Sequence, residues 1–238
     1  MCSSDLAKAL ALEGVQTIIV ARNEEKLRNL ADEIVVSGGA HPMVIVDDLT
    51  KRETPPRVAK TVLEKFGHVD ILINNLGQAR PFDLEAPDSD WDAAFDLNFM
   101  PPRKLAAALI PKMRERKFGR IVNLVTPLEP SGISASMPSK TAVLVWAKGL
   151  SRVVAKDGIT INSISPGMIM TDQIRNHYIP RVMPAKADQE RWLAQEVPAA
   201  RFGEPEDCAG LITFLCSPLA GYITGQRIGI DGGYQRHL

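Results

Sequence analysis

Short aliphatic runs alternate with longer amphipathic stretches along the whole chain, and this alternation most constrains what the chain can fold into. Alternation of this kind predicts βαβ units and a largely parallel sheet. The expected strands are residues 17–21, 43–47, 69–74, 120–125, 160–164 and 227–230. The expected helices are residues 4–13, 24–37, 55–66, 89–117, 135–156 and 205–216.

Several of these strands are apolar throughout, as in "TIIVA" and "DILIN", which indicates sheet faces covered by helices on both sides. We therefore expect one doubly wound α/β domain over residues 1–238. Pro101 and Pro102 lie inside the fourth predicted helix, where an interior proline breaks or kinks the axis. Residues 171–197 have weak periodicity and read as an insertion over the carboxyl edge of the sheet, where substrate lids lie.

The composition of the chain limits the kinds of molecule that it is expected to bind. The 28 basic and 28 acidic residues balance, so no basic face predicts binding to nucleic acid or an anionic membrane. Cys2, Cys208 and Cys216 form no CxxC pair, which supports neither a disulfide framework nor a zinc site. No apolar run approaches the roughly 18 residues needed to span a bilayer. We expect a soluble cytoplasmic protein that binds a small molecule.

Several segments occur in the order found in one enzyme family. They are "ILINNLG", the helix that begins at "SMPSK", "NSISPGMIMTD" and "ITGQRIGIDGGY". In this order they resemble the classical short-chain dehydrogenases/reductases, and within them the 3-oxoacyl-[acyl-carrier-protein] reductase branch. The resemblance covers nearly the whole chain. It implies a Rossmann fold, a nicotinamide cofactor, a carbonyl or secondary alcohol substrate, and a homo-oligomer (a dimer or tetramer).

The start of the chain departs from the family. Where the family has TGxxxGxG after its first strand, this chain reads "MCSSDLAKALALEG", with Met1, Asp5 and Ala7 at the glycine positions. The implied pyrophosphate contacts are then Ser3, Ser4 and Leu6. An ordinary helix capped by Ser3 or Ser4 is the alternative reading, and the Asp5 carboxylate would repel a pyrophosphate.

The preceding strand, which is central in this architecture, is missing. Its absence would leave two half-sheets without their shared hydrogen-bond partner. We therefore expect either that the chain starts inside a longer reading frame or that the fold is compromised.

Arg22 follows the strand at 17–21, where family members that use NADP carry a basic residue for the 2′-phosphate. Arg22 thus favours NADP over NAD, although a solvated arginine at a helix start would look the same. In "VDDLT", Asp48 and Leu49 match the adenine contacts of the family, and turn chemistry at a strand end is the alternative.

The resemblance assigns two further groups of cofactor contacts. Asn75 and Gly77 match the family's NNAG segment beside the adenine ribose, and Leu76 replaces its small residue. The "SPGMIMT" segment assigns the nicotinamide end of the cofactor to four residues: Pro166, Gly167, Ile169 and Thr171.

The resemblance also covers the catalytic positions, where Thr126 replaces the family's serine. The resemblance assigns the proton-relay asparagine to Asn98, the carbonyl-orienting hydroxyl to Thr126, and the cofactor-ribose lysine to Lys140, for which an exposed helical lysine is the alternative. Ser136 stands where the family has its catalytic tyrosine. Because positions i and i+4 share one helix face, Ser136 and Lys140 should point into one cleft. An aliphatic hydroxyl is a much weaker acid than a phenol.

Two hypotheses of different classes follow. The first is an NADP-dependent oxidoreductase. The second is a catalytically impaired relative that binds the cofactor or serves as a regulatory partner subunit, which Ser136 and the altered start favour. A third reading is a soluble α/β domain with neither role.

Overall fold

The computed structural model describes residues 3–77, 83–128, 132–172 and 174–236. Helices and strands alternate along them. In chain order the elements are α1 Ser3–Leu12, β1 Ile18–Ala21, α2 Glu24–Val36, β2 Met43–Val46, α3 Thr54–Phe66, β3 Ile71–Asn74, α4 Asp88–Asn98, α5 Met100–Arg116, β4 Gly119–Leu124, α6 Ser136–Val154, η1 Ala155–Asp157, β5 Ile159–Pro166, η2 Ile174–Tyr178, α7 Ile179–Val182, α8 Lys186–Glu196, α9 Pro205–Cys216, η3 Pro218–Ala220 and β6 Arg227–Ile230. Every strand expected from the sequence is present.

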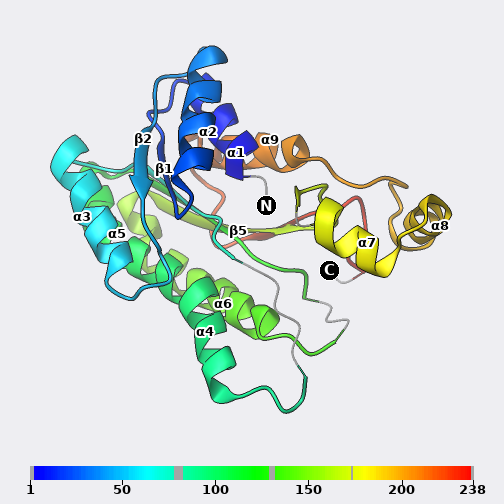
Figure 1. Cartoon of the computed structure of the whole chain (residues 1–238). Coiled ribbons are helices and arrows are strands. Elements are labelled where there is room, and N and C mark those ends of the chain that lie inside the picture. Colours follow the sequence, from blue (N-terminus) through cyan, green and yellow to red (C-terminus); the bar gives the residue numbers. More distant parts are fainter. Residues whose placement is uncertain (1–2, 78–82, 129–131, 173, 237–238) are drawn as a thin grey trace.

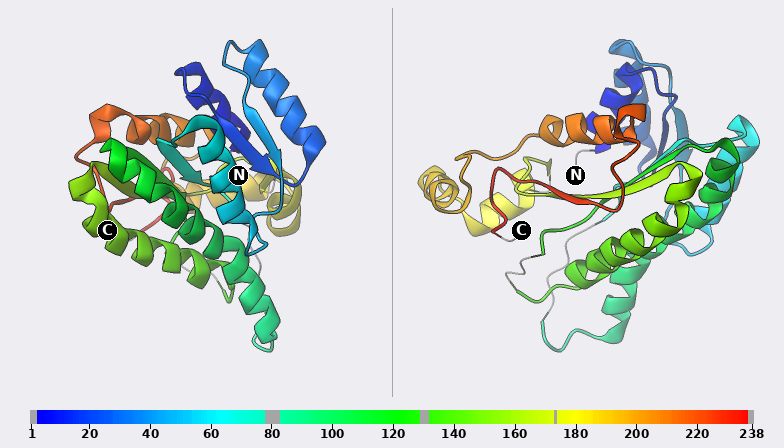
Figure 2. Two further views of the ribbon diagram at one scale, coloured as in Figure 1. Left: turned by 90° about the vertical axis from the view of Figure 1, so that its left-hand side faces the viewer. Right: turned by 180° about the vertical axis from the view of Figure 1, so that it is seen from behind.

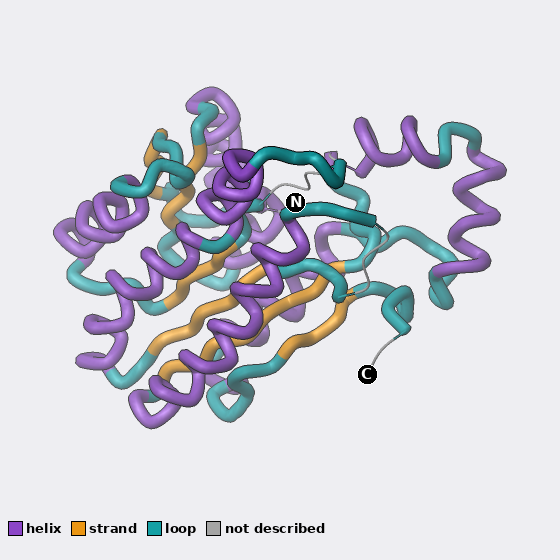
Figure 3. Tube along the Cα trace, turned by 90° about the horizontal axis from the view of Figure 1, so that it is seen from below, coloured by secondary structure: helices purple, strands orange, loops and turns teal. Residues whose placement is uncertain are grey.

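The strands form two separate parallel sheets. β1 pairs with β2, and the second sheet has the order β3-β4-β5-β6. Figure 3 shows strands of the larger sheet side by side. Within the described part of the chain, no strand joins β1 to β3. The expected consequence of a missing central strand, two half-sheets without a shared partner, is therefore confirmed.

Two layers of helices enclose the sheets. α1 packs against α2 and α9 on one side, whereas α3, α5, α6 and α4 pack in sequence on the other. Figure 1 and Figure 2 show the two layers on opposite faces of the strands. This is the doubly wound α/β arrangement that the apolar strands predicted.

Local sequence signals explain where several helices begin and end. Asn23 caps α2, because its side chain accepts a hydrogen bond from the Lys26 amide at 2.8 Å. α3 ends at Gly67, whose φ of 76° lies in the left-handed region that glycine adopts readily. The predicted break near Pro101 and Pro102 occurs at Phe99, so both prolines fall in the first turn of α5, where no amide donor is needed.

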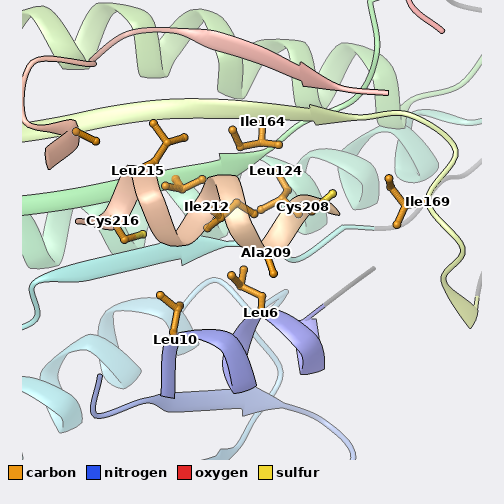
Figure 4. Packing of buried hydrophobic residues seen from close by; sticks show 12 residues of the cluster. Leu6, Leu10, Leu124, Ile164, Ile169, Cys208, Ala209, Ile212, Leu215 and Cys216 are labelled. Carbon is orange, nitrogen blue, oxygen red and sulfur yellow. The ribbon is translucent and has the colours of Figure 1, made fainter. Parts of the chain in front are cut away.

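The hydrophobic core runs through α1, α9 and the larger sheet. Figure 4 shows Leu6 and Leu10 of α1 directed at α9 near Ala209, with Leu124 and Ile164 beyond. Leu6 is only 4% exposed. α1 is thus held by burial of its apolar face. No described helix combines the length and apolarity needed to cross a membrane.

The region at 171–197 is more regular than its weak periodicity suggested. It contains η2, α7 and α8, which lie beyond the end of β5 in Figure 1. Tertiary contacts hold α8: Trp192 stacks on Phe202 with ring centres 6.2 Å apart and lies 5.6 Å from the ring of Tyr234. Glu196 pairs with Arg236 at 2.9 Å. All of these partners lie outside α8, and Tyr234 and Arg236 are distant in sequence, so local periodicity does not reveal them.

Candidate active site

The predicted site residues follow the carboxyl ends of parallel strands, which meet at one edge of each sheet. Asn75 and Gly77 come after β3, Thr126 after β4, and Gly167 after β5. Asn74, the last residue of β3, donates a buried 2.7 Å hydrogen bond to Asn123 Oδ1 on β4. That bond holds the ends of β3 and β4 together.

Three segments meet tightly at Gly77. A Cβ atom on Gly77 would lie 2.5 Å from Lys140 Nζ and 3.0 Å from Asn98 Oδ1. The loop after β3, the end of α4 and the first turns of α6 therefore converge here. Only glycine leaves room for the Lys140 amine at this point.

Lys140 is buried, with 7% of its surface exposed. Its Nζ donates a 2.9 Å hydrogen bond to the carbonyl oxygen of Leu124 at the end of β4. Burial lowers the pKa of the Lys140 amine to about 8. No carboxylate of the described residues pairs with it. The alternative reading, an exposed helical lysine, is wrong.

The residue four positions earlier, Ser136, is also buried, at 8% exposure. Its Oγ lies 2.6 Å from the Oγ of Ser134. Thr126 is half-buried in the loop after β4. Ser136 and the preceding Ser134 thus present a pair of aliphatic hydroxyls at the start of α6, where the family resemblance expects a phenol.

Asn98 is 1% exposed and lies at the last position of α4. Its Nδ2 donates to Ser139 Oγ at 3.1 Å, which ties α4 to α6. Its Oδ1 has no hydrogen-bond partner, and neither does the buried Oδ1 of Asn75. Buried acceptors without partners are costly, so these two oxygens fit a site that receives donors from a ligand.

The adenosine-end candidates lie together at the ends of β1 and β2. Hydrogen bonds from the Thr50 amide and hydroxyl are the main causes that lower the pKa of Asp48. The positive charge of the exposed Arg22 lowers it further, by a smaller effect. Asp48 Oδ1 accepts from the Thr50 amide at 3.0 Å and from its hydroxyl at 2.8 Å. Asp48 therefore stabilises a turn after β2, as the alternative interpretation predicted, and this is compatible with a contact to a ligand. Leu49 is half-buried next to it.

The candidates after β5 are packed against the lid region and the tail. Ile169 is buried and pairs with Gly203 in a parallel bridge, and the Gly167 amide donates to Ile230 O at 2.9 Å. Pro166 ends β5. Thr171 Oγ1 accepts from the Ile174 amide at 3.4 Å. A cavity of about 180 Å³ opens beside Ile169.

The start of α1 carries the remaining candidates. The helix begins at Ser3, so Ser4 lies inside the first turn rather than before it. Ser4 Oγ donates to the carboxylate of Asp5 at 3.2 Å. The side chain of Leu6 is packed in the core, which leaves only its backbone for a ligand. The first turn of α1 therefore offers amides to a phosphate and also a carboxylate that opposes one.

Sequence reasoning missed Ser134 and Ser139. The structure joins Ser134 to Ser136 and Ser139 to Asn98. The side chain of Ser139, on α6, is fully buried. The one sequence signal that could have pointed to it is a small polar residue directly before Lys140.

The chain is similar to known proteins over nearly its whole length. A family profile described as enoyl-(acyl carrier protein) reductase matches residues 3–235. The 3-oxoacyl-[acyl-carrier-protein] reductase of Vibrio cholerae is 31% identical over 234 residues, covering 96% of this chain and 90% of that relative. L-sorbose reductase from Gluconobacter frateurii, solved with NADPH and L-sorbose, has a TM-score of 0.92 and 29% identity, with 100% and 93% coverage. A 7α-hydroxysteroid dehydrogenase complexed with NADH has a TM-score of 0.89 and 27% identity, with 100% and 91% coverage. The chain belongs to the short-chain dehydrogenase/reductase family.

Proposed function

We propose that this protein is an NADP-dependent oxidoreductase that interconverts a carbonyl and a secondary alcohol, with 3-oxoacyl compounds as the substrate class. The convergence of Gly77, Asn98 and the buried amine of Lys140 carries the proposal. A buried lysine amine without a carboxylate partner is costly in an apo protein, and it is accounted for if ligand hydroxyls complete its hydrogen bonds.

The residues of the strand ends would hold the cofactor. Lys140 would bind the ribose of the nicotinamide half, and the first turn of α1 would contact the pyrophosphate. Ile169 and Thr171 would flank the nicotinamide, and Asn75 and Gly77 the adenine ribose. Arg22 supports NADP because an exposed guanidinium suits a 2′-phosphate. Among the similar structures, one was solved with NADPH and another with NADH, so the preference depends on Arg22.

When bound, the nicotinamide ring supplies or accepts the hydride. The Thr126 hydroxyl would donate a hydrogen bond that orients the substrate carbonyl. Lys140, with a pKa of about 8, carries a proton at neutral pH and can donate from Nζ. The oxygen of Asn98 would hold a water that delivers protons to that amine. Ser136 would contact the substrate oxygen as a weak acid, so slow turnover is expected.

Ser136 also favours the second candidate, a relative that binds the cofactor and acts as a partner subunit without turning over substrate. The hydroxyl pair of Ser134 and Ser136 lacks the acidity of a phenol. Cofactor binding is common to both candidates, and turnover separates them.

A titration tests both. NADPH and then NADH would be added while energy transfer from the three tryptophans to the reduced nicotinamide is followed. Consumption of NADPH with a panel of β-ketoesters would be measured next. Saturable NADPH binding with slow ketoester reduction supports the proposal. Binding without turnover supports the partner role, and a lack of saturation into the millimolar range contradicts both.

A further inference from the structure

Two serine hydroxyls and a buried amine belong to the same end of α6. Ser136 is the first residue of this helix and Lys140 lies one turn further along, with 8% and 7% of their surfaces exposed. Ser134 Oγ, just before the helix, lies 2.6 Å from Ser136 Oγ. Because long side chains on a helix lean back towards its N-terminus, the stem of Lys140 extends over the turn that begins with Ser136. Ser136 and Lys140 therefore share one face of the helix.

The amine of Lys140 can act as a base. Burial alone lowers its pKa to about 8, and no charge among the described residues contributes to the shift. At pH 7 roughly one molecule in ten then carries an uncharged amine. One N–H of Nζ is used in the 2.9 Å hydrogen bond to Leu124 O, so the lone pair of the uncharged form can accept a proton. A desolvated lysine of this kind can activate a serine hydroxyl.

The two hydroxyls make a contact that a helix cap does not require. Ser134 Oγ accepts a hydrogen bond from the Ser136 amide at 3.3 Å, and this contact alone satisfies an amide at the helix start. The 2.6 Å distance to Ser136 Oγ is a second hydrogen bond, at the short end of the range for two hydroxyls. With Ser136 as the donor, its proton points at Ser134, and the lone pairs of Ser136 Oγ are left for a substrate carbon.

The surroundings of the hydroxyl pair suit an acyl group. α6 is 19 residues long, and the amides of its first turn give that end a partial positive charge. Negative charge that develops on the oxygen of a tetrahedral intermediate is stabilised there. Ile133 directly precedes Ser134, and Leu128 follows Thr126 by two residues. These two apolar side chains are 50% and 38% exposed, which favours a ligand with an apolar chain.

We propose that Ser136 is a nucleophile and that the protein hydrolyses carboxylic esters and thioesters of apolar acyl groups without a nicotinamide cofactor. Ser136 Oγ forms a bond to the carbonyl carbon, while its proton passes through Ser134 to the uncharged amine of Lys140. Lys140 then returns that proton to the alcohol or thiol, and the bond between the carbonyl carbon and this leaving group breaks. An acyl group esterified to Ser136 remains.

Water completes the cycle. A water oxygen attacks the acyl carbon, Lys140 takes the proton of that water, and the bond to Ser136 breaks to release the carboxylic acid. The proton returns from Lys140 to Ser136, so both side chains regain their first state. No group is oxidised or reduced, and water is the only co-reactant. The reaction goes beyond the proposed oxidoreductase activity and does not depend on it.

Covalent labelling of the full chain, without cofactor, tests the nucleophile. The probe is an alkyl fluorophosphonate, which reacts with activated serines and loses fluoride. We expect one adduct by intact mass, located on Ser136 by peptide mapping, and none on Ser136→Ala. Ser151→Ala is the matched control, because Ser151 is also buried on α6 but lies about 22 Å further along the helix axis. This control should be labelled as fast as the wild type.

Hydrolysis of p-nitrophenyl butyrate tests the base. After subtraction of the buffer rate, the wild-type rate should rise with pH and level off above about pH 8, as the Lys140 amine loses its proton. Lys140→Met should lower the rate by about 100-fold, the lower end of what general base catalysis contributes. A thermal melt shows that this variant is folded. Ser134→Ala should lower the rate roughly tenfold through loss of one hydrogen bond.

Three results would overturn the proposal. They are the lack of an adduct on the wild type, an adduct that remains on Ser136→Ala, and hydrolysis that is unchanged in folded Lys140→Met. In each case the Ser134 hydroxyl would serve only to cap α6. The readouts involve no nicotinamide cofactor, so failure here is distinguishable from failure of the proposed oxidoreductase activity, which NADPH binding and ketoester reduction test.

Discussion

Ser134 Oγ and Ser136 Oγ lie 2.6 Å apart at the start of α6, one turn from the buried amine of Lys140. The pair occupies the place at which the family resemblance expects a phenol. These two hydroxyl groups can form hydrogen bonds to a substrate oxygen, but they are too weakly acidic to protonate it efficiently.

Restoring the phenol should therefore restore rate. Ser136→Tyr is expected to raise kcat for NADPH-dependent reduction of a β-ketoester by about 100-fold, the lower end of what general acid catalysis contributes. Steady-state kinetics checks this. Ser136→Ala is the matched control, and it should not raise kcat because it adds no phenol. A Ser136→Tyr variant that binds NADPH yet gains nothing would argue for the partner-subunit role.

Replacing Lys140 should raise the stability of the protein and abolish its binding of NADPH. Burial lowers the pKa of this amine from 10.5 to about 8. Keeping the amine charged in the folded state therefore lowers the free energy of unfolding. Lys140→Met is expected to raise the free energy of unfolding of the apo protein at pH 7 by about 2 kcal/mol, after loss of the hydrogen bond to Leu124 O. The same variant should lose NADPH binding in a tryptophan titration.

The pH dependence of that stability difference has a defined direction. Between pH 8 and 10.5 the unfolded state holds the Lys140 proton and the folded state releases it, so the wild type gains stability as pH rises. Denaturant unfolding of both proteins across this window should show the advantage of Lys140→Met shrinking. An advantage that stays constant would mean that the amine is not destabilised by burial.

Gly77→Ala tests the contact at the centre of the site. The new Cβ would lie 2.5 Å from Lys140 Nζ, so the amine must move. We expect NADPH affinity to fall at least tenfold. Gly149→Ala is the control, because a Cβ on Gly149, inside α6, meets nothing within 4 Å and should leave affinity unchanged. Isothermal titration of both variants measures the difference.

Arg22 should set the choice between cofactors. Arg22→Ala is expected to reduce NADPH affinity by roughly tenfold and leave NADH affinity nearly unchanged, because only NADPH carries the 2′-phosphate. The exposed Arg28, which pairs with Glu24 on α2, provides the matched control as Arg28→Ala. Equal losses for both cofactors would instead mean that Arg22 acts through the fold.

Asp5 should weaken pyrophosphate binding. Its carboxylate stands in the first turn of α1, the end of a helix that attracts anions. Asp5→Asn removes one charge of the same sign as the phosphates and should tighten NADPH binding roughly fivefold at low salt, with a smaller effect at high salt. Asp32→Asn, an exposed position on α2, should have no effect. Unaltered NADPH affinity for Asp5→Asn would place the pyrophosphate elsewhere.

Much of the fold is predictable because its signals are local. Continuous aliphatic runs such as "DILIN" mark buried parallel strands, and the paired prolines mark the break at Phe99. Asn23 and Gly67 delimit α2 and α3 through their own backbone preferences. The helices of residues 174–196 were not predicted, because α8 depends on contacts of the Trp192 ring with Phe202 and Tyr234.

By itself the sequence determined the order of the strands and helices, the family, and the absence of a tyrosine four residues before Lys140, since each is a matter of which residue follows which. Only the tertiary structure decided that Lys140 is buried against Leu124 and Gly77, that Asn98 keeps an unpaired oxygen, and that β1 and β3 lie in separate sheets. Burial and pairing depend on groups brought together from distant segments, so packing rather than local propensity determines them.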